Sequence, residues 1–326
     1  MKIDSVIIIK NEEKNIEKLI NQFLEYSNEI HITDTGSTDN TLEIIQKYVQ
    51  EYKNVFLHHF IWINDFGAAR NYCMTCYDCH ADYQFWCDAD DYMNDKLIET
   101  LKKFSNEDNL NDDIYYIKYK ITGNRFINRQ SLLRVNAHLK WYDPIHEYIR
   151  VYTTNTQNLT YFDNGSNLIH NPSNTYNHCE RNLNIFLNME KNNYKFTKRN
   201  LYYFGRELSN NKLYEKSKEI FKKCIDKNDE KNLMHELNSC INLFKLNDDE
   251  SIDYFNKLLK NNNYRKDLFF RAGDYFFKRK QYDLAKLYLI MASNCKEPDD
   301  KHIMFYDKLT QTNIDNKLKE IENLKK

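Results

Sequence analysis

Three carboxylates lie within four residues directly after a short apolar segment. Asp88, Asp90 and Asp91 follow 83–86, whose aromatic residues are typical of a buried strand. Carboxylates this close together repel one another unless a cation lies among them. Divalent cations such as Mg²⁺ and Mn²⁺ take oxygen ligands and share them with phosphates. The run therefore indicates a site for a divalent metal that carries a diphosphate.

Other polar residues follow three further apolar segments, at 5–9, 30–33 and 55–60. These polar residues are Lys10, Asn11, Glu12, Asp34, Asp65 and Arg70. Apolar residues at helical spacing fill 16–24 and 41–49, after the first two segments. Alternating strands and helices predict a parallel sheet flanked by helices, which binds ligands at the carboxyl ends of its strands. We therefore expect these polar residues to meet at one edge of the sheet.

The turn after Asp34 combines a glycine with two hydroxyl residues. Gly36 can adopt turn conformations that residues with a Cβ avoid. Ser37 or Thr38 is expected to cap the following helix, because serine and threonine are favoured N-cap residues.

The order of these motifs resembles one enzyme family. The N-terminal half is similar to a family 2 glycosyltransferase with the GT-A fold. The resemblance covers roughly residues 1–180 and depends on five segments in the family's order. The segments are Ile9–Glu13, Asp34–Thr41, Asp65–Asn71, Asp88–Asp91 and Trp141–Glu147. The implied fold is an α/β domain with a mixed, mainly parallel sheet, in which 114–121, 130–135 and 148–152 add mixed or antiparallel strands.

The resemblance also implies the chemistry, which is an inverting, metal-dependent transfer of a hexose from a nucleotide-diphosphate sugar, with UDP favoured over GDP. A metal, Mn²⁺ or Mg²⁺, neutralises the leaving diphosphate in such enzymes. Family position assigns contacts with the nucleotide sugar to Lys10, Asn11, Glu12, Asp34, Arg70, Asp88 and Ala89. It assigns the metal to Asp88 and Asp90 of the DxD motif, together with His170.

Structural roles stay open for several of these residues. Asp34 also suits a turn or a helix cap. Arg70 also suits a salt bridge with Asp65 or Asp88. His170, after the last expected strand of the domain, also suits simple packing.

The general base that the acceptor hydroxyl needs is expected within residues 143–147. Glu147 is the first candidate, because a carboxylate beside an imidazole can be tuned to accept a proton. Asp143 is the second candidate, and His146 is a third that also suits metal or diphosphate. A structural pair of His146 and Glu147 that closes the site is the alternative.

Helical periodicity replaces strand patterns from about residue 181 onward. Gly205 and Tyr214 are nine residues apart, and Gly273 and Tyr282 repeat this spacing 68 residues later, which is twice 34. A helical pair of 34 residues resembles the tetratricopeptide repeat. We expect a catalytic domain over 1–180 and an α-helical tetratricopeptide-like domain over 181–326.

That helical domain is expected to contain three helix pairs over 198–294 and a terminal capping helix. Stacked repeats present a concave surface, which could hold a protein, peptide or glycan acceptor. A stabilising buttress or a dimer interface is the alternative role. A non-catalytic adaptor, with a degenerate transferase domain and protein-binding repeats, is the alternative function.

Composition narrows the class of protein. The 326 residues contain 47 basic and 48 acidic side chains, which gives no electrostatic case for nucleic acid. No apolar run reaches the length of a membrane span, and the first strand leaves no room for a signal peptide, so a cytoplasmic protein is expected. A sugar-nucleotide pyrophosphorylase is disfavoured, because its glycine-rich loop is missing and the first glycine is Gly36.

Eight cysteines are present, and four of them crowd into 73–87. Cys73, Cys76 and Cys79 are expected along one face of a helix, where a free cysteine packs as a small apolar residue. A zinc or iron–sulfur site is the alternative for this spacing. Without a secretory signal, reduced thiols are expected.

Overall fold

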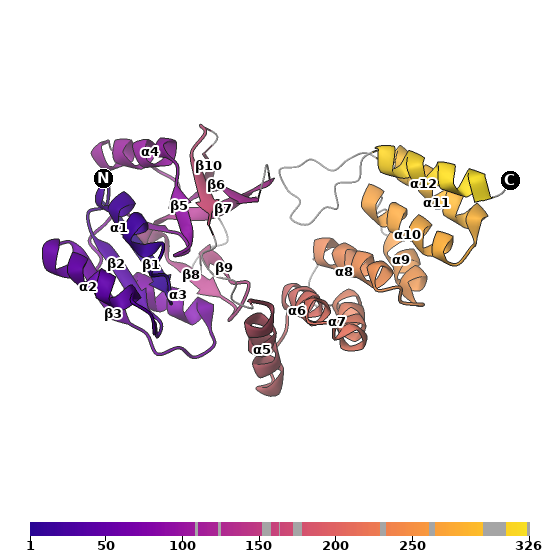
Figure 1. Cartoon of the computed structure of the whole chain (residues 1–326), viewed down its shortest axis with the longest axis horizontal. Coiled ribbons are helices and arrows are strands. Elements are labelled where there is room, and N and C mark those ends of the chain that lie inside the picture. The colour runs from indigo at the N-terminus through magenta and orange to yellow at the C-terminus, as the bar shows by residue number, and fades with distance from the viewer. Residues whose placement is uncertain are drawn as a thin grey trace. The chain divides into compact units, whose positions relative to one another are not determined.

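The computed structural model describes residues 1–107, 110–122, 125–151, 158–162, 164–171, 178–228, 233–260, 265–295 and 311–324. The chain divides into two compact units, Met1–Tyr176 and Asn177–Lys326. The first unit combines strands and helices, and the second is helical (Figure 1). The predicted fold class, an α/β domain with a mixed sheet followed by a helical region, is confirmed.

A mixed sheet forms the centre of the first unit. Among the described residues its strands follow the order β3-β2-β1-β4-β7-β6-β11-β5, and β10 pairs with β6. The strands are β1 (Ile3–Ile9), β2 (Ile30–Asp34), β3 (Val55–His59), β4 (Tyr83–Trp86), β5 (Asp91–Met93), β6 (Ile114–Thr122), β7 (Arg125–Arg134), β10 (Leu159–Tyr161) and β11 (Asn167–His170). Strands β1 to β4 run parallel, and β7 is antiparallel to both β4 and β6. The parallel strands bring the ends of β1, β2 and β4 to one edge.

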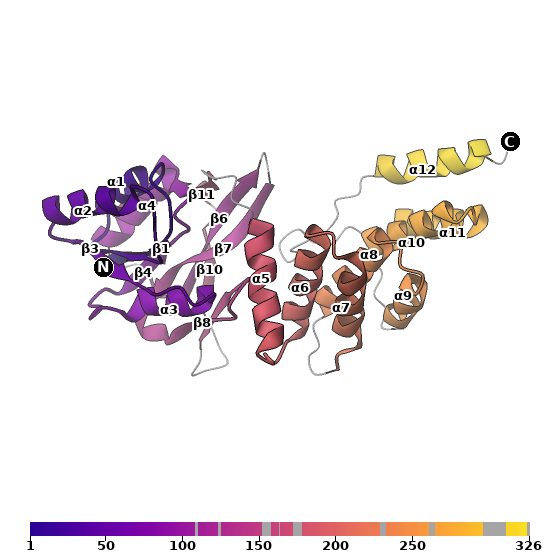
Figure 2. The ribbon, with the colours of Figure 1, turned by 60° about the horizontal axis from the view of Figure 1, so that its bottom comes forward.

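Apolar side chains cover both faces of this sheet. One face packs against α1 (Ile16–Leu24), α2 (Thr41–Glu51) and α4 (Asp95–Asn106). The other face packs against α3 (Phe66–Thr75) and a two-stranded sheet of β8 (Leu139–Tyr142) and β9 (Tyr148–Val151), as Figure 2 shows. These two layers hold the loops at the carboxyl edge in place.

The predicted strands over 114–121 and 130–135 are present as β6 and β7, but the third prediction was partly wrong. Strand β9 pairs with β8 outside the main sheet. Its buried Ile149 and the Trp141 side chain of β8 pack in the core beneath α3, so this hairpin covers the sheet and does not extend it. Tyr152, the last residue of the predicted strand, lies outside the described residues.

The predicted cap of the second helix was also wrong. Helix α2 begins at Thr41, and Asn40 is its N-cap. The Ser37 hydroxyl instead accepts a hydrogen bond from the Asn11 amide at 3.0 Å, and the Thr38 amide donates to Asn11 Oδ1 at 2.7 Å. Asn11 has a left-handed backbone conformation, with φ 56°. Ser37 and Thr38 therefore connect the loop after β2 to the loop after β1.

The cysteine prediction needs one correction. Helix α3 ends at Thr75, with Cys76 as its C-cap, so Cys79 lies in the following loop and not on the helix. Cys73 is buried, and burial raises the pKa of its thiol to about 12. Cys73 is the one buried cysteine of this helix, and all eight cysteines of the chain are free thiols.

The second unit consists of helices that pack in consecutive pairs. Its described helices are α5 (His178–Lys191), α6 (Lys198–Asn210), α7 (Tyr214–Asp226), α8 (Leu233–Lys245), α9 (Ser251–Leu259), α10 (Lys266–Lys278), α11 (Tyr282–Asn294) and α12 (Gln311–Leu324). The pairs α6–α7, α8–α9 and α10–α11 fill the predicted range 198–294. Membership of the tetratricopeptide class stays a prediction.

The turns within these pairs repeat one backbone pattern. In each, a residue of positive φ follows the first helix, and the next amide bonds to the carbonyl five residues earlier, as in a Schellman motif. The positive-φ residues are Lys212, Asn247 and Lys280. The bonds are Leu213 N to Leu208 O, Asp248 N to Leu243 O and Gln281 N to Phe276 O, at 2.9 to 3.1 Å. The internal repeat in the sequence therefore corresponds to a repeated backbone structure.

Small residues allow close packing in the pairs. A Cβ on Gly205 would lie 2.6 Å from the Phe221 ring, and one on Gly273 would lie 2.8 Å from Leu289 Cγ. The Ser217 hydroxyl donates to the Gly205 carbonyl at 2.7 Å. The glycines that the sequence singles out are therefore required by helix contact.

No helix in the described part of the chain is long and apolar enough to cross a membrane.

Candidate active site

The carboxyl edge of the parallel strands gathers the polar motifs. Lys10 follows β1, Asp34 ends β2, and Asp88 lies two residues after β4. Because β1 pairs with both β2 and β4, these three strand ends are adjacent. Lys10 is exposed, whereas Asp34 is buried.

Asp88 is held by two arginines. Arg70 Nη2 of α3 lies 2.6 Å from Asp88 Oδ1, and Arg129 of β7 bonds to Asp88 Oδ2. Burial opposes ionisation of Asp88, but the two guanidinium charges outweigh it and hold the pKa of this carboxyl well below its usual range. Asp88 is therefore an anion fixed between two cations.

The two arginines enclose an aromatic ring. The Trp86 ring centre lies 4.3 Å from Arg70 Cζ and 4.5 Å from Arg129 Cζ. Such cation–π contacts add to the ion pairs in a partly buried site. Trp141 packs edge-on against Trp86 at 4.7 Å between centroids, so aromatic rings fix both guanidinium groups.

A second group at this edge has the donors of a metal site. Oxygen or nitrogen atoms of Asp90, Asp91 and His170 all lie within 4.8 Å of one another. His170 Nδ1 is 3.6 Å from Asp90 Oδ2 and 3.4 Å from Asp91 Oδ1. Burial and the neighbouring Asp88 and Asp91 raise the pKa of Asp90 to about 6. Two carboxylates and an imidazole fit Mn²⁺ or Mg²⁺.

Asp91 has more contacts than its place in the sequence suggests. It is the first residue of β5 and is buried, and it accepts hydrogen bonds from Tyr119 at 2.9 Å and from Arg129 at 2.8 Å. Its Oδ2 also accepts from the Asp88 amide at 3.0 Å. Asp91 therefore fixes the loop that carries Asp88 and Asp90.

Helix α3 positions the segment that contains the base candidates. The Asp65 carboxylate accepts from the Ala68 amide at 2.7 Å and so caps the helix. The Phe66 amide donates to the Pro144 carbonyl at 2.8 Å. A Cβ on Gly67 would lie 2.6 Å from the Asp143 carbonyl oxygen, so glycine is needed for this close approach.

The three base candidates lie in the turn between β8 and β9, and Glu147 is the one linked to the acidic group. Arg70 Nε donates to Glu147 Oε1 at 2.7 Å, which links Glu147 through one guanidinium to Asp88. Asp143 and His146 both have positive φ, at 69° and 50°. Because few non-glycine residues adopt this conformation, the turn between β8 and β9 is a constrained one.

The proposed nucleotide contacts lie on the β1 and β2 side of the edge. Asp34 accepts hydrogen bonds from the Gly36 and Ser37 amides at 2.9 and 3.1 Å, which is the turn role considered above. Glu12 accepts from Asn15 Nδ2 at 2.9 Å. Ala89 is buried between the acids of the DxD motif. The structure brings these residues to one edge, and their contacts with a donor stay a prediction.

Arg129 is the site residue that the sequence analysis missed. In the antiparallel pairing of β4 and β7, Phe85 lies opposite Leu132, and the same register continued places Arg129 beside Asp88. Arg129 lies among the polar residues Asn128, Gln130 and Ser131 in the middle of β7, so the local sequence offered no signal. Its partner lies 41 residues away in the sequence.

Comparison with known proteins agrees with the motifs. The sequence matches the family "Glycosyl transferase family 2" over residues 5–171. The chain belongs to this family. The predicted GT-A-type α/β domain and the predicted class of enzyme, a glycosyltransferase, are thus confirmed at the level of the family.

Two curated relatives illustrate the family. The SPbeta prophage-derived glycosyltransferase SunS of Bacillus subtilis (strain 168) is 29% identical over 217 residues, which cover 62% of this chain and 48% of SunS. The poly(ribitol-phosphate) beta-glucosyltransferase of Bacillus spizizenii is 29% identical over 142 residues, covering 42% of this chain and 22% of that protein. The chain therefore spans less than half the length of each of these two relatives.

A solved structure is similar over most of the chain. S. aureus TarS 1–349 in complex with UDP-GlcNAc has a TM-score of 0.43 and 14% sequence identity, covering 94% of this chain and 98% of that one.

Proposed function

We propose that this member of the family is an inverting, metal-dependent glycosyltransferase that uses a nucleotide-diphosphate sugar, with UDP as the favoured nucleotide. The observation that carries the proposal is the group of Asp90, Asp91 and His170 beside Asp88 at the carboxyl edge of the sheet. This edge is where sheets of this type bind nucleotides. The family resemblance supports inversion and the choice of UDP.

Asp90 and His170 would hold the metal, with Asp91 next to them. A bound Mn²⁺ or Mg²⁺ neutralises charge on a leaving diphosphate. The imidazole favours Mn²⁺, because Mg²⁺ prefers oxygen ligands. The role proposed for Asp88 is to orient Arg70 and Arg129, whose planar guanidinium groups suit phosphate oxygens. Lys10, Asn11, Glu12, Asp34 and Ala89 are proposed to line the nucleotide side.

Glu147 is proposed as the general base for the acceptor hydroxyl. Its link to Arg70 holds the carboxylate close to the acidic group and uses only Oε1. Asp143 and His146, in the same constrained turn, are the alternatives. A base must lie within hydrogen-bond reach of the acceptor, which this turn allows for a substrate at the same edge.

The acceptor is proposed to be a protein, peptide or glycan that the helical unit helps to hold. The name of the Bacillus spizizenii relative gives poly(ribitol phosphate) and a glucosyl group for that protein. The helical unit supports a large acceptor, because paired helices stack into extended surfaces.

Slow hydrolysis of a panel of nucleotide sugars, without acceptor and with or without Mn²⁺, tests the proposal. Metal-dependent release of one nucleotide is expected, and Asp90→Ala should abolish it while circular dichroism shows an intact fold. Hydrolysis that is equal with and without Mn²⁺, or unchanged in Asp90→Ala, would contradict the metal site. Binding of UDP without turnover of any donor, even with candidate acceptors, would favour the non-catalytic adaptor.

A further inference from the structure

A cavity of about 780 Å³, which we call the α3 cavity, lies beside the C-terminal half of α3. Its walls come from α3, the loop after α3, strand β4 and the segment from the end of β7 to β8. Among the described residues, none that is proposed to bind donor, metal or acceptor lines this cavity. Thr75, His138 and Lys140 in its wall are exposed, so the cavity opens to solvent. A volume of this size can hold a small molecule.

The α3 cavity has basic side chains and no acidic ones in its described wall. Arg134 ends β7, His138 follows the 3-10 helix Val135–Ala137, and Lys140 lies in β8. Within the described part of the chain, Lys140 forms no ion pair. Arg134 Nε lies 4.0 Å from Asp113 Oδ1, at the limit of an ion pair, and Asp113 is outside the wall. A hollow lined by one sign of charge attracts ligands of the opposite sign, so this cavity favours an anion.

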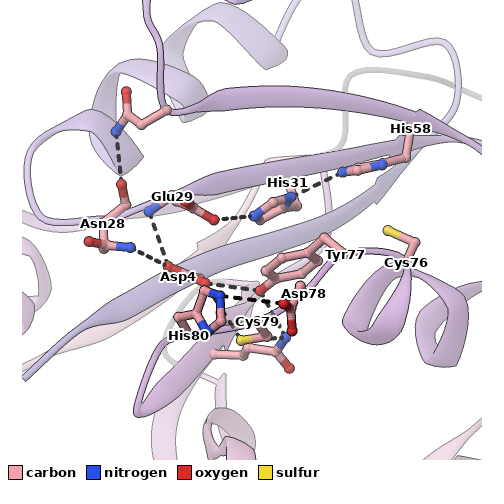
Figure 3. A network of polar contacts seen from close by, with 12 residues as sticks. Asp4, Asn28, Glu29, His31, His58, Cys76, Tyr77, Asp78, Cys79 and His80 are labelled. Carbon is pink, nitrogen blue, oxygen red and sulfur yellow. Dashed lines mark hydrogen bonds and ion pairs between the residues drawn. The ribbon is translucent and has the colours of Figure 1, made fainter.

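A buried amide in the same wall is fixed by hydrogen bonds. Gln84 of β4 is 2% exposed, and its Nε2 donates to the Met74 carbonyl at 2.9 Å and to the Tyr77 hydroxyl at 3.0 Å. The Tyr77 hydroxyl donates in turn to Asp4 at 3.1 Å, within the network that Figure 3 shows. Gln84 Oε1 accepts no hydrogen bond from the described residues. An amide oxygen can accept two hydrogen bonds, so this one is open to a donor on a ligand.

Two tyrosines add aromatic surface to the wall. The Tyr77 ring stacks on His31 at 3.3 Å between centroids, and the Tyr142 ring stacks on Tyr148 at 5.6 Å. Each ring is therefore held in place by a neighbour that lies outside the wall. Lys140 Nζ lies 5.9 Å from the Tyr142 centroid, which brings a positive charge next to an aromatic side chain. Rigid aromatic side chains with a few polar groups are typical of sites that bind ring compounds.

We propose that the α3 cavity binds a phosphate ester of a ring compound, which is the chemistry shared by sugar phosphates and nucleotides. Arg134, His138 and Lys140 bind the phosphate, because guanidinium and ammonium groups suit its charged oxygens. The ring lies against the tyrosines, and Gln84 Oε1 accepts a hydrogen bond from it. Inorganic phosphate would fill only a small part of 780 Å³, which favours the larger ester. The site is separate from the donor edge, so this proposal does not depend on the proposed transfer.

Calorimetric titration of the purified full chain measures this binding. The probes are hexose phosphates, nucleoside monophosphates and inorganic phosphate, and EDTA suppresses metal-dependent binding at the donor edge. At least one ester should bind with a Kd below about 1 mM and more tightly than inorganic phosphate. Lys140→Glu should weaken its binding by about tenfold or more, because it replaces an attractive charge with a repulsive one. The controls Lys47→Glu, at a lysine of α2 that is 68% exposed, and Asp90→Asn should keep wild-type affinity.

Alkylation of the wild-type chain locates the ligand without relying on variants. Cys79 lines the cavity and is half-buried, and Cys295, a half-buried thiol of the helical unit, is the matched control. A saturating ester should slow the labelling of Cys79, followed by mass spectrometry, and leave that of Cys295 unchanged. The proposal is overturned if no ester binds, if inorganic phosphate binds as tightly as every ester, or if Lys140→Glu keeps wild-type affinity. Labelling of Cys79 that is equally fast with and without bound ester would also overturn it.

Discussion

At the scale of single residues, the three acids after β4 have three different environments. Asp88 lies between Arg70 and Arg129, Asp90 faces His170, and Asp91 is buried against Tyr119. Their pKa values separate accordingly, with that of Asp88 lowered and that of Asp90 raised to about 6. Groups whose environments separate their pKa values are typical of functional sites. The division of roles proposed above follows from this difference.

Asp90 makes the metal-free protein less stable at neutral pH. Its folded pKa of about 6 exceeds the ordinary value of 3.8, so the stabilising protonated form is present below pH 4 and is lost as the pH rises through 6. Asp90→Asn removes this loss. Without metal, the stability of the variant relative to wild type should rise by about 2 kcal/mol between pH 4.5 and 7.5.

Urea unfolding in EDTA at the two pH values measures this difference. Asp78→Asn, which removes a carboxylate that is 93% exposed, is the matched control and should follow the wild type. An Asp90→Asn variant with the same pH dependence as the wild type would contradict the raised pKa.

Glu147→Gln tests the assignment of the base. The amide keeps the size of the side chain and can still accept the bond from Arg70, but it cannot take a proton. Donor binding should stay unchanged, while transfer to acceptor falls by about 10² to 10⁴-fold. The readouts are donor Kd by calorimetry and kcat for transfer. Wild-type turnover would move the assignment to Asp143, with Asp143→Asn as the comparison variant.

At the scale of elements, the helix pairs depend on glycines at their contacts. Gly205→Ala improves the helix propensity of α6 by about 1 kcal/mol, but its Cβ would lie 2.6 Å from the Phe221 ring. Overpacking typically costs about 1–3 kcal/mol, so a net destabilisation of up to about 2 kcal/mol is expected in chemical unfolding of the helical unit.

Two further variants separate packing from propensity. Ser209→Ala, a change on the same helix at a half-exposed position, should not destabilise the unit. Adding Phe221→Leu to Gly205→Ala should recover part of the loss, because it makes room for the new methyl group. A Gly205→Ala variant as stable as wild type would show that the two helices can separate without loss.

At the scale of the whole molecule, the proposed donor and acceptor functions fall in different units. Every residue proposed to bind donor or metal lies in Met1–Tyr176. A chain that ends at Tyr176 should keep metal-dependent donor hydrolysis, because it retains the sheet edge and α3. It should lose transfer to a large acceptor. The two activities are measured in parallel after circular dichroism confirms folding.

The outcome decides the role of the helical unit. Equal transfer by the shortened and full chains would contradict acceptor binding and would favour a stabilising or dimerising role. The Gly205→Ala variant serves as an intermediate case, since its donor hydrolysis should equal that of wild type.

The sequence by itself predicted most of the architecture. Apolar runs that end in Asp34 and in the acids after Trp86 predicted the strands and the edge that carries the candidate site, and the spacing of Gly205 and Gly273 predicted the helix pairs. These features depend on local periodicity and on turn chemistry, which neighbouring residues determine. The same local rules failed at 37–38, where the hydroxyl and amide groups bind Asn11 of another loop.

Only the tertiary structure decided which side chains meet. It paired Asp88 with Arg129, 41 residues away, and placed Asp91 with Asp90 and His170. It also brought Asp4 to Cys79, 75 residues away. Such contacts depend on strand order and register, which arise from packing of the whole sheet against its helices. A residue's type and its immediate neighbours do not determine that packing. The contacts of each acid, and therefore its charge state, could be assigned only from the tertiary structure.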